Sequence, residues 1–151
     1  MTSVPGALVC AAALLLLAAC AGGKSYSDSV APKNLTLRTA SSARAALGVH
    51  SVDAQCRTEY LGTVALDKPS AEIGIPPERW SYLVFDFSTS SFLAAKRTRI
   101  TLETLLKPRA GYRYEASVTY REDIYNVVIR EQSHRGAWRE VAFRDLATCK
   151  N

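Results

Sequence analysis

The sequence predicts a mainly β chain: a single antiparallel β-sandwich of seven or eight short strands, with one or two short helices. Two observations lead to this prediction. Apolar and polar residues alternate along several short segments, and turn-forming residues separate these segments about every 8–14 residues. The composition agrees, because 48% hydrophobic and 22% charged residues in a chain of 151 are ordinary globular values. These values argue against wholesale disorder, a collagen-like repeat and a polytopic membrane protein.

The strongest alternation predicts a hairpin in the C-terminal half. Tyr112, Tyr114 and Val118 share one face of residues 112–120, and polar residues occupy the other face. A second alternating run, residues 124–131, follows three polar turn residues. Both runs have the pattern of half-buried antiparallel strands. Shorter runs predict the other strands, at residues 35–37, 47–49, 60–66, 71–75, 81–87 and 99–105.

Helix is expected in only two short segments. Residues 42–47 are rich in alanine and are expected to make one or two turns, and residues 91–97 begin with a serine that can cap a helix. The tail, residues 137–147, has apolar spacings that fit either a helix or a strand. We predict a strand there, since a terminal strand is readily tied down by Cys149.

The first part of the chain contains an unbroken apolar run of 13 residues, 7–19. A helix of this length reaches roughly 20 Å, whereas about 20 apolar residues are needed to cross a bilayer. The run therefore has the length of the hydrophobic region of a signal peptide. The alternative is a buried core helix, but the run has no polar face to turn toward water.

The end of this run resembles the lipobox of bacterial lipoprotein precursors. Its residues are Leu17-Ala18-Ala19-Cys20, and in that class small residues precede a cysteine whose thiol accepts a diacylglycerol group. The resemblance implies that Cys20 is the lipidation site and that residues 1–19 are removed as a lipoprotein signal peptide. The alternative is an ordinary secretory leader with a chance cysteine.

The residues after Cys20 suggest where such a lipoprotein would be held. In many bacteria with two membranes, an aspartate directly after the lipidated cysteine retains the protein in the inner membrane, and here that position is Ala21. The resemblance therefore implies the periplasmic face of the outer membrane. Residues 20–33 are rich in Gly and Ser and are expected to form a flexible tether. The β-sandwich domain is expected to span residues 34–151.

The four cysteines of the chain then sort by position. Cys10 lies in the expected signal peptide and Cys20 is expected to carry lipid, so Cys56 and Cys149 remain. Two thiols left over in an exported domain usually join, and we predict a Cys56–Cys149 disulfide. Closing so long a loop stabilises a fold by on the order of 4 kcal/mol in the chain-entropy model.

A metal site is the alternative use of these thiols. Such a site needs three or four ligands, but the only histidines are His50 and His134, and there is no Cys-x-x-Cys or His-x-x-x-His spacing. We therefore expect no metal and no cofactor.

The segment 105–114 resembles a turn found in small exported sandwich domains. Leu105, Pro108, Gly111 and Tyr114 have the order Leu…Pro…Gly-x-x-Tyr, in which the glycine allows the turn and the tyrosine begins the buried face of a strand. The resemblance is to the broad prealbumin-like or immunoglobulin-like class and implies a β-sandwich.

No enzyme signature is present. His50 lies near Ser51 and Asp53, but on a strand Ser51 points to the opposite face from His50, so no nucleophile–base contact is expected. Glu122 and Asp123 are adjacent carboxylates in a predicted hairpin turn, where a solvated turn is the simpler reading. We expect a protein that is not an enzyme.

Positive charge is concentrated in the C-terminal part. Residues 1–95 have no net charge, whereas residues 96–151 carry +5. The densest cluster, Lys96, Arg97 and Arg99, is a candidate anion-binding patch. Its candidate neighbours are Lys107, Arg109, Arg113, Arg135, Arg139 and Arg144. The alternative is that these side chains keep strand edges soluble.

These observations together predict an outer-membrane lipoprotein with a structural, assembly or binding role in the cell envelope. The expected partners are the membrane, reached through the N-terminal lipid, and an envelope protein or an anionic glycolipid; nucleic acid is not expected. Two alternatives remain. One is a subunit of an envelope-spanning secretion machine, since small type VI secretion lipoproteins are similar in length, leader and fold class. The other is a small envelope hydrolase.

Overall fold

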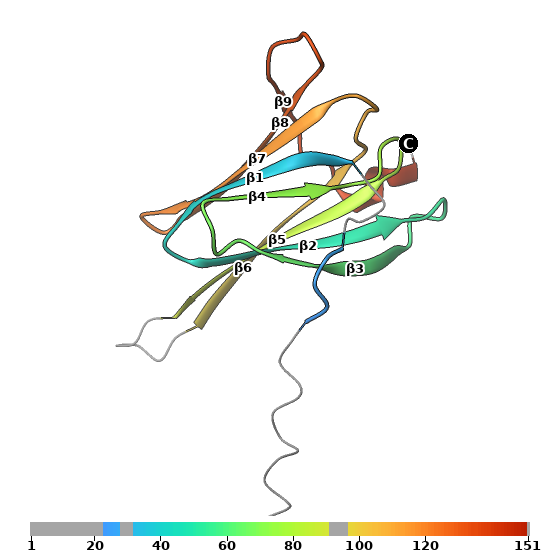
Figure 1. Cartoon of the computed structure of the whole chain (residues 1–151). Coiled ribbons are helices and arrows are strands. Elements are labelled where there is room, and N and C mark those ends of the chain that lie inside the picture. The colour runs from blue at the N-terminus through green and yellow to red at the C-terminus, as the bar shows by residue number, and fades with distance from the viewer. Residues whose placement is uncertain (1–22, 28–31, 91–96, 151) are drawn as a thin grey trace, which may run out of the picture.

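A computed structural model describes residues 23–27, 32–90 and 97–150 (Figure 1). The described residues contain nine β-strands and one short 3-10 helix, η1. Their bounds are β1 (Lys33–Ser41), β2 (Arg44–Val52), β3 (Thr58–Ala65), β4 (Ser70–Gly74), β5 (Ser81–Ser90), β6 (Arg97–Leu106), β7 (Arg113–Arg121), β8 (Ile124–Gln132), β9 (Arg139–Val141) and η1 (Leu146–Lys150). The prediction of a mainly β chain with very little helix is confirmed.

The strands form two sheets that lie over one another (Figure 1). The five-stranded sheet has the order β4-β1-β7-β8-β9, and the four-stranded sheet has the order β3-β2-β5-β6. Every named pair is antiparallel except β1 and β7, which run parallel from Leu35 opposite Tyr114 to Ser41 opposite Tyr120. The prediction of purely antiparallel pairing is therefore wrong at this pair. Alternation shows which residues face inward, but it does not identify the neighbouring strand or its direction.

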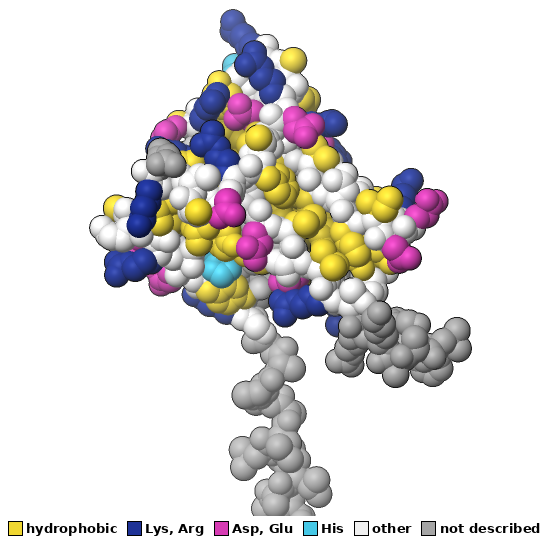
Figure 2. All heavy atoms as spheres, turned by 180° about the vertical axis from the view of Figure 1, so that it is seen from behind, with side chains coloured by type: hydrophobic (Ala, Val, Ile, Leu, Met, Phe, Trp, Pro, Cys, Tyr) yellow, Lys and Arg dark blue, Asp and Glu magenta, His cyan; other side chains and the backbone are white. Residues whose placement is uncertain are grey.

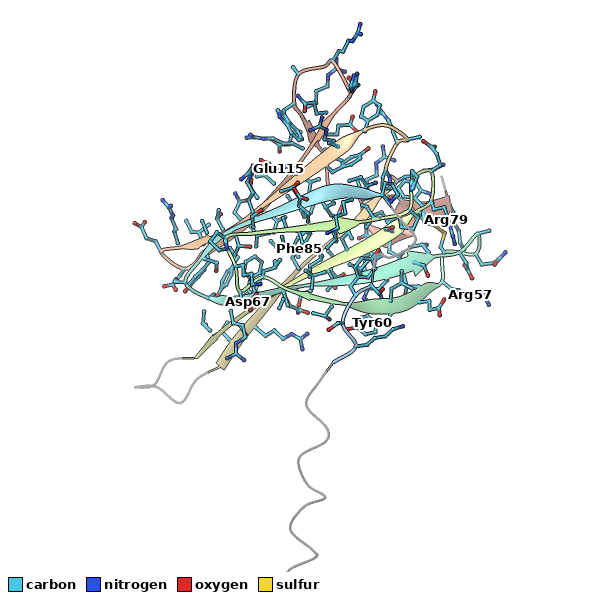
Figure 3. The ribbon with its side chains drawn as sticks, viewed as in Figure 1. Arg57, Tyr60, Asp67, Arg79, Phe85 and Glu115 are labelled. Atoms are coloured by element: carbon cyan, nitrogen blue, oxygen red, sulfur yellow. A yellow bond between two sulfur atoms is a disulfide. The ribbon has the colours of Figure 1, made fainter. Side chains whose placement is uncertain are left out.

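Both sheets contribute to one hydrophobic core. The side chains of Leu37, Phe85, Ala116 and Val118 are fully buried, and Figure 3 shows Phe85 in the interior between the layers. These residues alternate with polar ones along their strands, as a half-buried sheet requires. Burying a large apolar side chain contributes roughly 1.5–3 kcal/mol, so this shared core is the main stabilising feature of the two sheets.

The first predicted helix is absent. The segment 42–47 is a turn followed by the start of β2, and the Ser41 hydroxyl accepts a hydrogen bond from the Ala43 N–H at 3.1 Å. The reason is the alternation that continues through the segment: Ala45 and Leu47 are buried in the core beside exposed Arg44. Burial in the sheet outweighs the small helix propensity of alanine. The second predicted helix, residues 91–97, lies outside the described residues except for Arg97, which begins β6.

The C-terminal tail contains a strand of only three residues. β9 covers Arg139–Val141, and the predicted strand over 137–147 is wrong beyond it, because the chain leaves the sheet and ends in η1. Asp145 explains the change, since its carboxylate accepts the Ala147 N–H at 2.8 Å and its carbonyl accepts the Thr148 N–H at 2.9 Å. A side chain that binds the backbone two residues later favours a tight turn over an extended strand.

The predicted Cys56–Cys149 disulfide is confirmed. The two Cα atoms lie 5.9 Å apart, and the bond closes a separation of 93 residues. It joins η1 to the loop between β2 and β3. Asp53 holds this loop, because its carboxylate accepts the Gln55 and Arg57 N–H groups at 2.9 Å each. The bonds from Arg57 lower the pKa of Asp53 below its usual value.

Part of the expected tether is attached to the fold. Residues 24–26, here called the N-terminal clip, lie against β3. The Tyr26 N–H donates to the Thr63 carbonyl at 3.0 Å, and the Thr63 N–H donates to the Lys24 carbonyl at 2.8 Å. The Tyr26 hydroxyl donates to the Gly74 carbonyl at 2.5 Å, and its ring packs against the core. This part of segment 20–33 is therefore bound, in contrast to the flexible tether expected there.

The close approach of the clip to β3 predicts that a side chain at Gly62 lowers stability. This residue has φ of 152°, and a Cβ atom there would lie 2.5 Å from both the Cα and the N atom of Tyr26. We expect Gly62→Ala to displace the clip and to lower the free energy of unfolding by about 1–3 kcal/mol, measured by urea denaturation. Gly23→Ala is the matched control, because a Cβ at Gly23 meets no atom within 4 Å. Equal stability of the two variants would contradict a close approach of the clip to β3.

A second prediction concerns the loss of stability when the disulfide is removed. Replacing both Cys56 and Cys149 by serine is expected to lower stability by up to about 4 kcal/mol, because the unfolded chain regains the entropy of an open loop. Hydrogen exchange should increase first in residues 142–150, before the sheets open. Unchanged melting and unchanged exchange in this segment would show that the tail is held without the bond.

Candidate functional site

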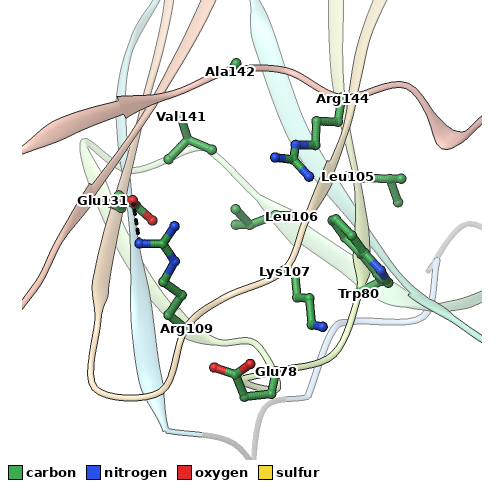
Figure 4. A pocket seen from close by; sticks show the side chains of 10 residues that line it. All are labelled: Glu78, Trp80, Leu105, Leu106, Lys107, Arg109, Glu131, Val141, Ala142 and Arg144. Carbon is green, nitrogen blue, oxygen red and sulfur yellow. Dashed lines mark ion pairs between the residues drawn. The ribbon is translucent and has the colours of Figure 1, made fainter. Parts of the chain in front are cut away.

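A pocket lies where the tail crosses from one sheet to the other. It has a volume of about 420 Å³ and is here called the Trp80 pocket (Figure 4). Its walls come from the β4–β5 loop, the end of β6, the β6–β7 loop, β8, the end of β9 and the segment after β9. Buried Leu106 and partly buried Val141 form the apolar base, while Leu105 lines the pocket from the opposite face of β6 (Figure 4). A small-molecule site usually has this combination of an apolar base and a few polar groups.

Two cations lie beside the Trp80 ring. The Lys107 Nζ is 6.0 Å from the ring centroid and the Arg144 Cζ is 5.9 Å from it (Figure 4). Both distances are within the range of cation–π attraction. Within the described residues, neither cation pairs with a carboxylate. The fold thus brings two like charges to one aromatic ring and leaves both uncompensated.

The two carboxylates of the pocket are already engaged. Glu131 pairs with Arg109 at 3.4 Å and accepts a hydrogen bond from the Tyr114 hydroxyl at 3.3 Å. Glu78 accepts the Ala110 N–H at 3.0 Å. Burial raises the pKa of the Tyr114 phenol, so Tyr114 stays a donor to Glu131. The charges of Glu131 and Arg109 compensate each other, whereas Lys107 and Arg144 beside Trp80 have no carboxylate partner among the described residues.

Backbone hydrogen bonds fix the walls of the pocket. The Arg144 carbonyl accepts the Leu105 N–H at 2.8 Å, and the Arg144 N–H donates to the Thr104 hydroxyl at 3.0 Å. On the other side, the Glu78 N–H donates to the Pro108 carbonyl at 2.7 Å. The pocket is therefore preformed, although its cationic side chains remain exposed.

The predicted patch is not a cluster of free cations. Lys96 lies outside the described residues, and for Arg97 only the backbone, at the start of β6, is described. The Arg99 guanidinium is paired with Asp86 on β5 at 2.9 Å. This cross-strand partner compensates the charge that made Arg99 a candidate.

The expected neighbours of the patch divide into two groups and one separate residue, Arg113, which begins β7 and does not line the Trp80 pocket. Lys107, Arg109 and Arg144 line the Trp80 pocket. Arg135 and Arg139 belong to the β8–β9 turn and β9, and Figure 2 shows basic side chains gathered at this tip. Sequence reasoning missed Trp80, although a tryptophan directly before a predicted strand and close to a Pro-Pro turn was a usable signal.

His50 is packed between two tyrosines. Its ring centroid lies 5.2 Å from that of Tyr60 and 5.8 Å from that of Tyr82. Burial lowers the pKa of His50, and the charge of Glu103 opposes this shift in part. The Tyr82 hydroxyl donates to Glu103, and burial together with this bond raises the pKa of Tyr82 to about 12. The neighbours of His50 are thus aromatic rings, not the nucleophile that a hydrolase would place beside it.

The remaining candidates have structural explanations. Glu122 and Asp123 form the turn between β7 and β8, with φ of 51° and 64°, and Asp123 accepts the Tyr120 hydroxyl at 2.7 Å. Two residues of positive φ are typical of a tight hairpin turn.

Within the ranges that the structure describes, no three His, Cys, Asp or Glu side chains gather as metal ligands. Cys20 lies outside those ranges, and no helix within them is long and apolar enough to cross a membrane.

Comparison with known proteins adds a distant fold likeness. No protein-family model and no curated protein matches the chain. Among solved structures, the chain is similar to the crystal structure of transthyretin from Sparus aurata, with 14% sequence identity and a TM-score of 0.47. The match covers 68% of this chain and 100% of that chain. The likeness concerns the arrangement of strands only.

The packing of His50 predicts a pH effect on stability. Because its pKa is lower in the fold than the ordinary 6.5, the unfolded chain binds more protons below about pH 6.5. The melting temperature should therefore decrease as the pH is lowered from about 7.5 to 5. The His50→Gln variant should show a weaker dependence on pH. His134→Gln, in an exposed turn, is the control and should leave the slope unchanged. An equal slope in wild type and His50→Gln would contradict the lowered pKa.

Proposed function

We propose that the chain is an outer-membrane lipoprotein, anchored through lipid on Cys20, that presents a prealbumin-like β-sandwich on the periplasmic face and has a binding or assembly role in the envelope. The disulfide is the observation that carries the proposal. It occupies Cys56 and Cys149, so the one other cysteine outside the apolar run is Cys20, in the lipobox-like segment. Disulfides persist in exported proteins and are rare in the cytosol, which supports an exported domain.

The N-terminal clip supports a specific geometry for this anchor. Only residues 21–23 separate Cys20 from the clip, and a fully extended chain spans at most about 3.6 Å per residue. Cys20 therefore lies within about 15 Å of Lys24. With lipid on Cys20, the edge of the domain that carries β3 would be held close to the bilayer. The expected 14-residue tether would have allowed a much greater separation.

The Trp80 pocket supports a binding role over a purely structural one. A structural domain has no need for two uncompensated cations beside a partly buried tryptophan over an apolar base. Two cations beside one ring, with no carboxylate partner among the described residues, favour a ligand of opposite charge.

The anchor is tested at Cys20. Cys20→Ser should abolish labelling with palmitate and release the protein from the membrane fraction, because a serine hydroxyl does not replace the thiolate in acyl transfer. Cys10→Ser is the matched control, since it removes a cysteine but leaves the lipobox-like segment intact, and should label normally.

A second substitution tests the destination. If the outer-membrane assignment is correct, Ala21→Asp should move the labelled protein from the outer to the inner membrane on a density gradient. Palmitate labelling of Cys20→Ser would refute the lipoprotein proposal. A wild-type protein found in the inner membrane would refute only the assigned location.

A further inference from the structure

Lys107 and Arg144 of the Trp80 pocket differ from the four described arginines that form ion pairs, one of which, Arg109, also lines the pocket. Arg38, Arg57, Arg99 and Arg109 each lie within 3.4 Å of a carboxylate oxygen. Lys107 and Arg144 instead share Trp80, which attracts cations weakly and carries no charge to compensate them. The pocket therefore combines two cations that have no carboxylate partner among the described residues with one aromatic ring and an apolar base.

We propose that the Trp80 pocket binds a phosphate monoester. Its phosphate lies between Lys107 and Arg144, and its organic part lies over Leu106 and Val141. This site does not depend on the lipid anchor, and it holds whether the monoester is a free small molecule or a lipid headgroup.

The charge and shape of the pocket favour this class of ligand. A phosphate monoester carries about −1.5 to −2 at pH 7, which matches two cations, whereas a carboxylate carries only −1. Arginine binds phosphate oxygens through a planar fork, and lysine acts as a mobile point charge. The cavity of about 420 Å³ is within the range of small-molecule sites, and its base is apolar.

The carboxylates of the pocket also orient the ligand. Glu131 is compensated by Arg109, and Glu78 is bound to the Ala110 N–H, yet both would repel an anion placed beside them. Repulsion by Glu131 therefore favours the opposite side of the pocket, where Trp80 lies (Figure 4). Because the backbone of Arg144 is held on β6, little order has to be created when the ligand binds.

Trp80 provides the signal for the test. The chain has two tryptophans, so Trp138→Phe leaves Trp80 as the single tryptophan. The full chain in detergent is titrated with inorganic phosphate, n-butyl phosphate and butyrate at constant ionic strength. We expect a saturable change in Trp80 fluorescence, tightest for n-butyl phosphate. Binding should weaken at about pH 5, where the phosphate loses its second negative charge.

Substitutions then locate the site. Lys107→Gln and Arg144→Gln should each weaken n-butyl phosphate binding by about tenfold, because each removes a charge-assisted hydrogen bond. Arg135→Gln is the matched control: it removes the same charge outside the pocket and should bind as the parent does. The melting temperature of each variant shows whether it is folded. If Arg144→Gln does not fold, the test rests on Lys107→Gln.

Three outcomes would overturn the proposal. They are the absence of saturable binding, butyrate binding as tightly as n-butyl phosphate, and equal weakening by Arg135→Gln.

A vesicle experiment distinguishes a lipid headgroup from a free small molecule as the source of the monoester. The protein is reconstituted into phosphatidylcholine vesicles with and without phosphatidate. A Trp80 change caused by phosphatidate itself identifies a headgroup, and a change only on adding n-butyl phosphate identifies a free ligand; both support the site.

Discussion

The two backbone hydrogen bonds of Arg144 join the sheets at their open side. Val141 is the last residue of β9 in the five-stranded sheet, and three residues later Arg144 is bonded to Thr104 and Leu105 on β6 of the other sheet. The disulfide at Cys149 then fixes the end of the same segment. The Trp80 pocket exists because this crossing chain passes over the ends of the strands. Loss of the crossing would remove one wall of the pocket and the cation that the wall carries.

The N-terminal clip has a comparable role at β3, the edge strand of the four-stranded sheet. An edge strand exposes unpaired N–H and C=O groups that invite pairing with another chain. The clip satisfies two such groups of Thr63, and Gly62 provides the space for its backbone. One short segment thus covers part of an edge and fixes where the chain leaves the domain. Under the lipoprotein proposal, the same contact sets the distance of the fold from the membrane.

The sequence predicted what depends on local alternation and missed what depends on pairing. Each alternating run overlaps a described strand, because the side of a strand that faces the core is encoded in successive residues. The parallel β1–β7 pair is not encoded in this way, and neither is the tail beyond β9. The disulfide could be predicted because elimination left two thiols. The densest basic cluster was a poor guide, since Asp86 lies across the sheet from Arg99.

Pairing across the fold, not net charge, decides where a charged ligand can be held. Exposed ion pairs such as Arg99–Asp86 contribute only about 0–1 kcal/mol to stability, but they remove a cation from those able to attract an anion. Exposed charges that lie more than about 10 Å apart are largely screened from each other at 0.1 M salt, so distant basic residues add little to the attraction of an anion. Lys107 and Arg144 are 37 positions apart in the chain and act together only because both reach Trp80. The excess charge of residues 96–151 thus becomes a site where the tail crosses to β6, and there it has an apolar base and fixed walls.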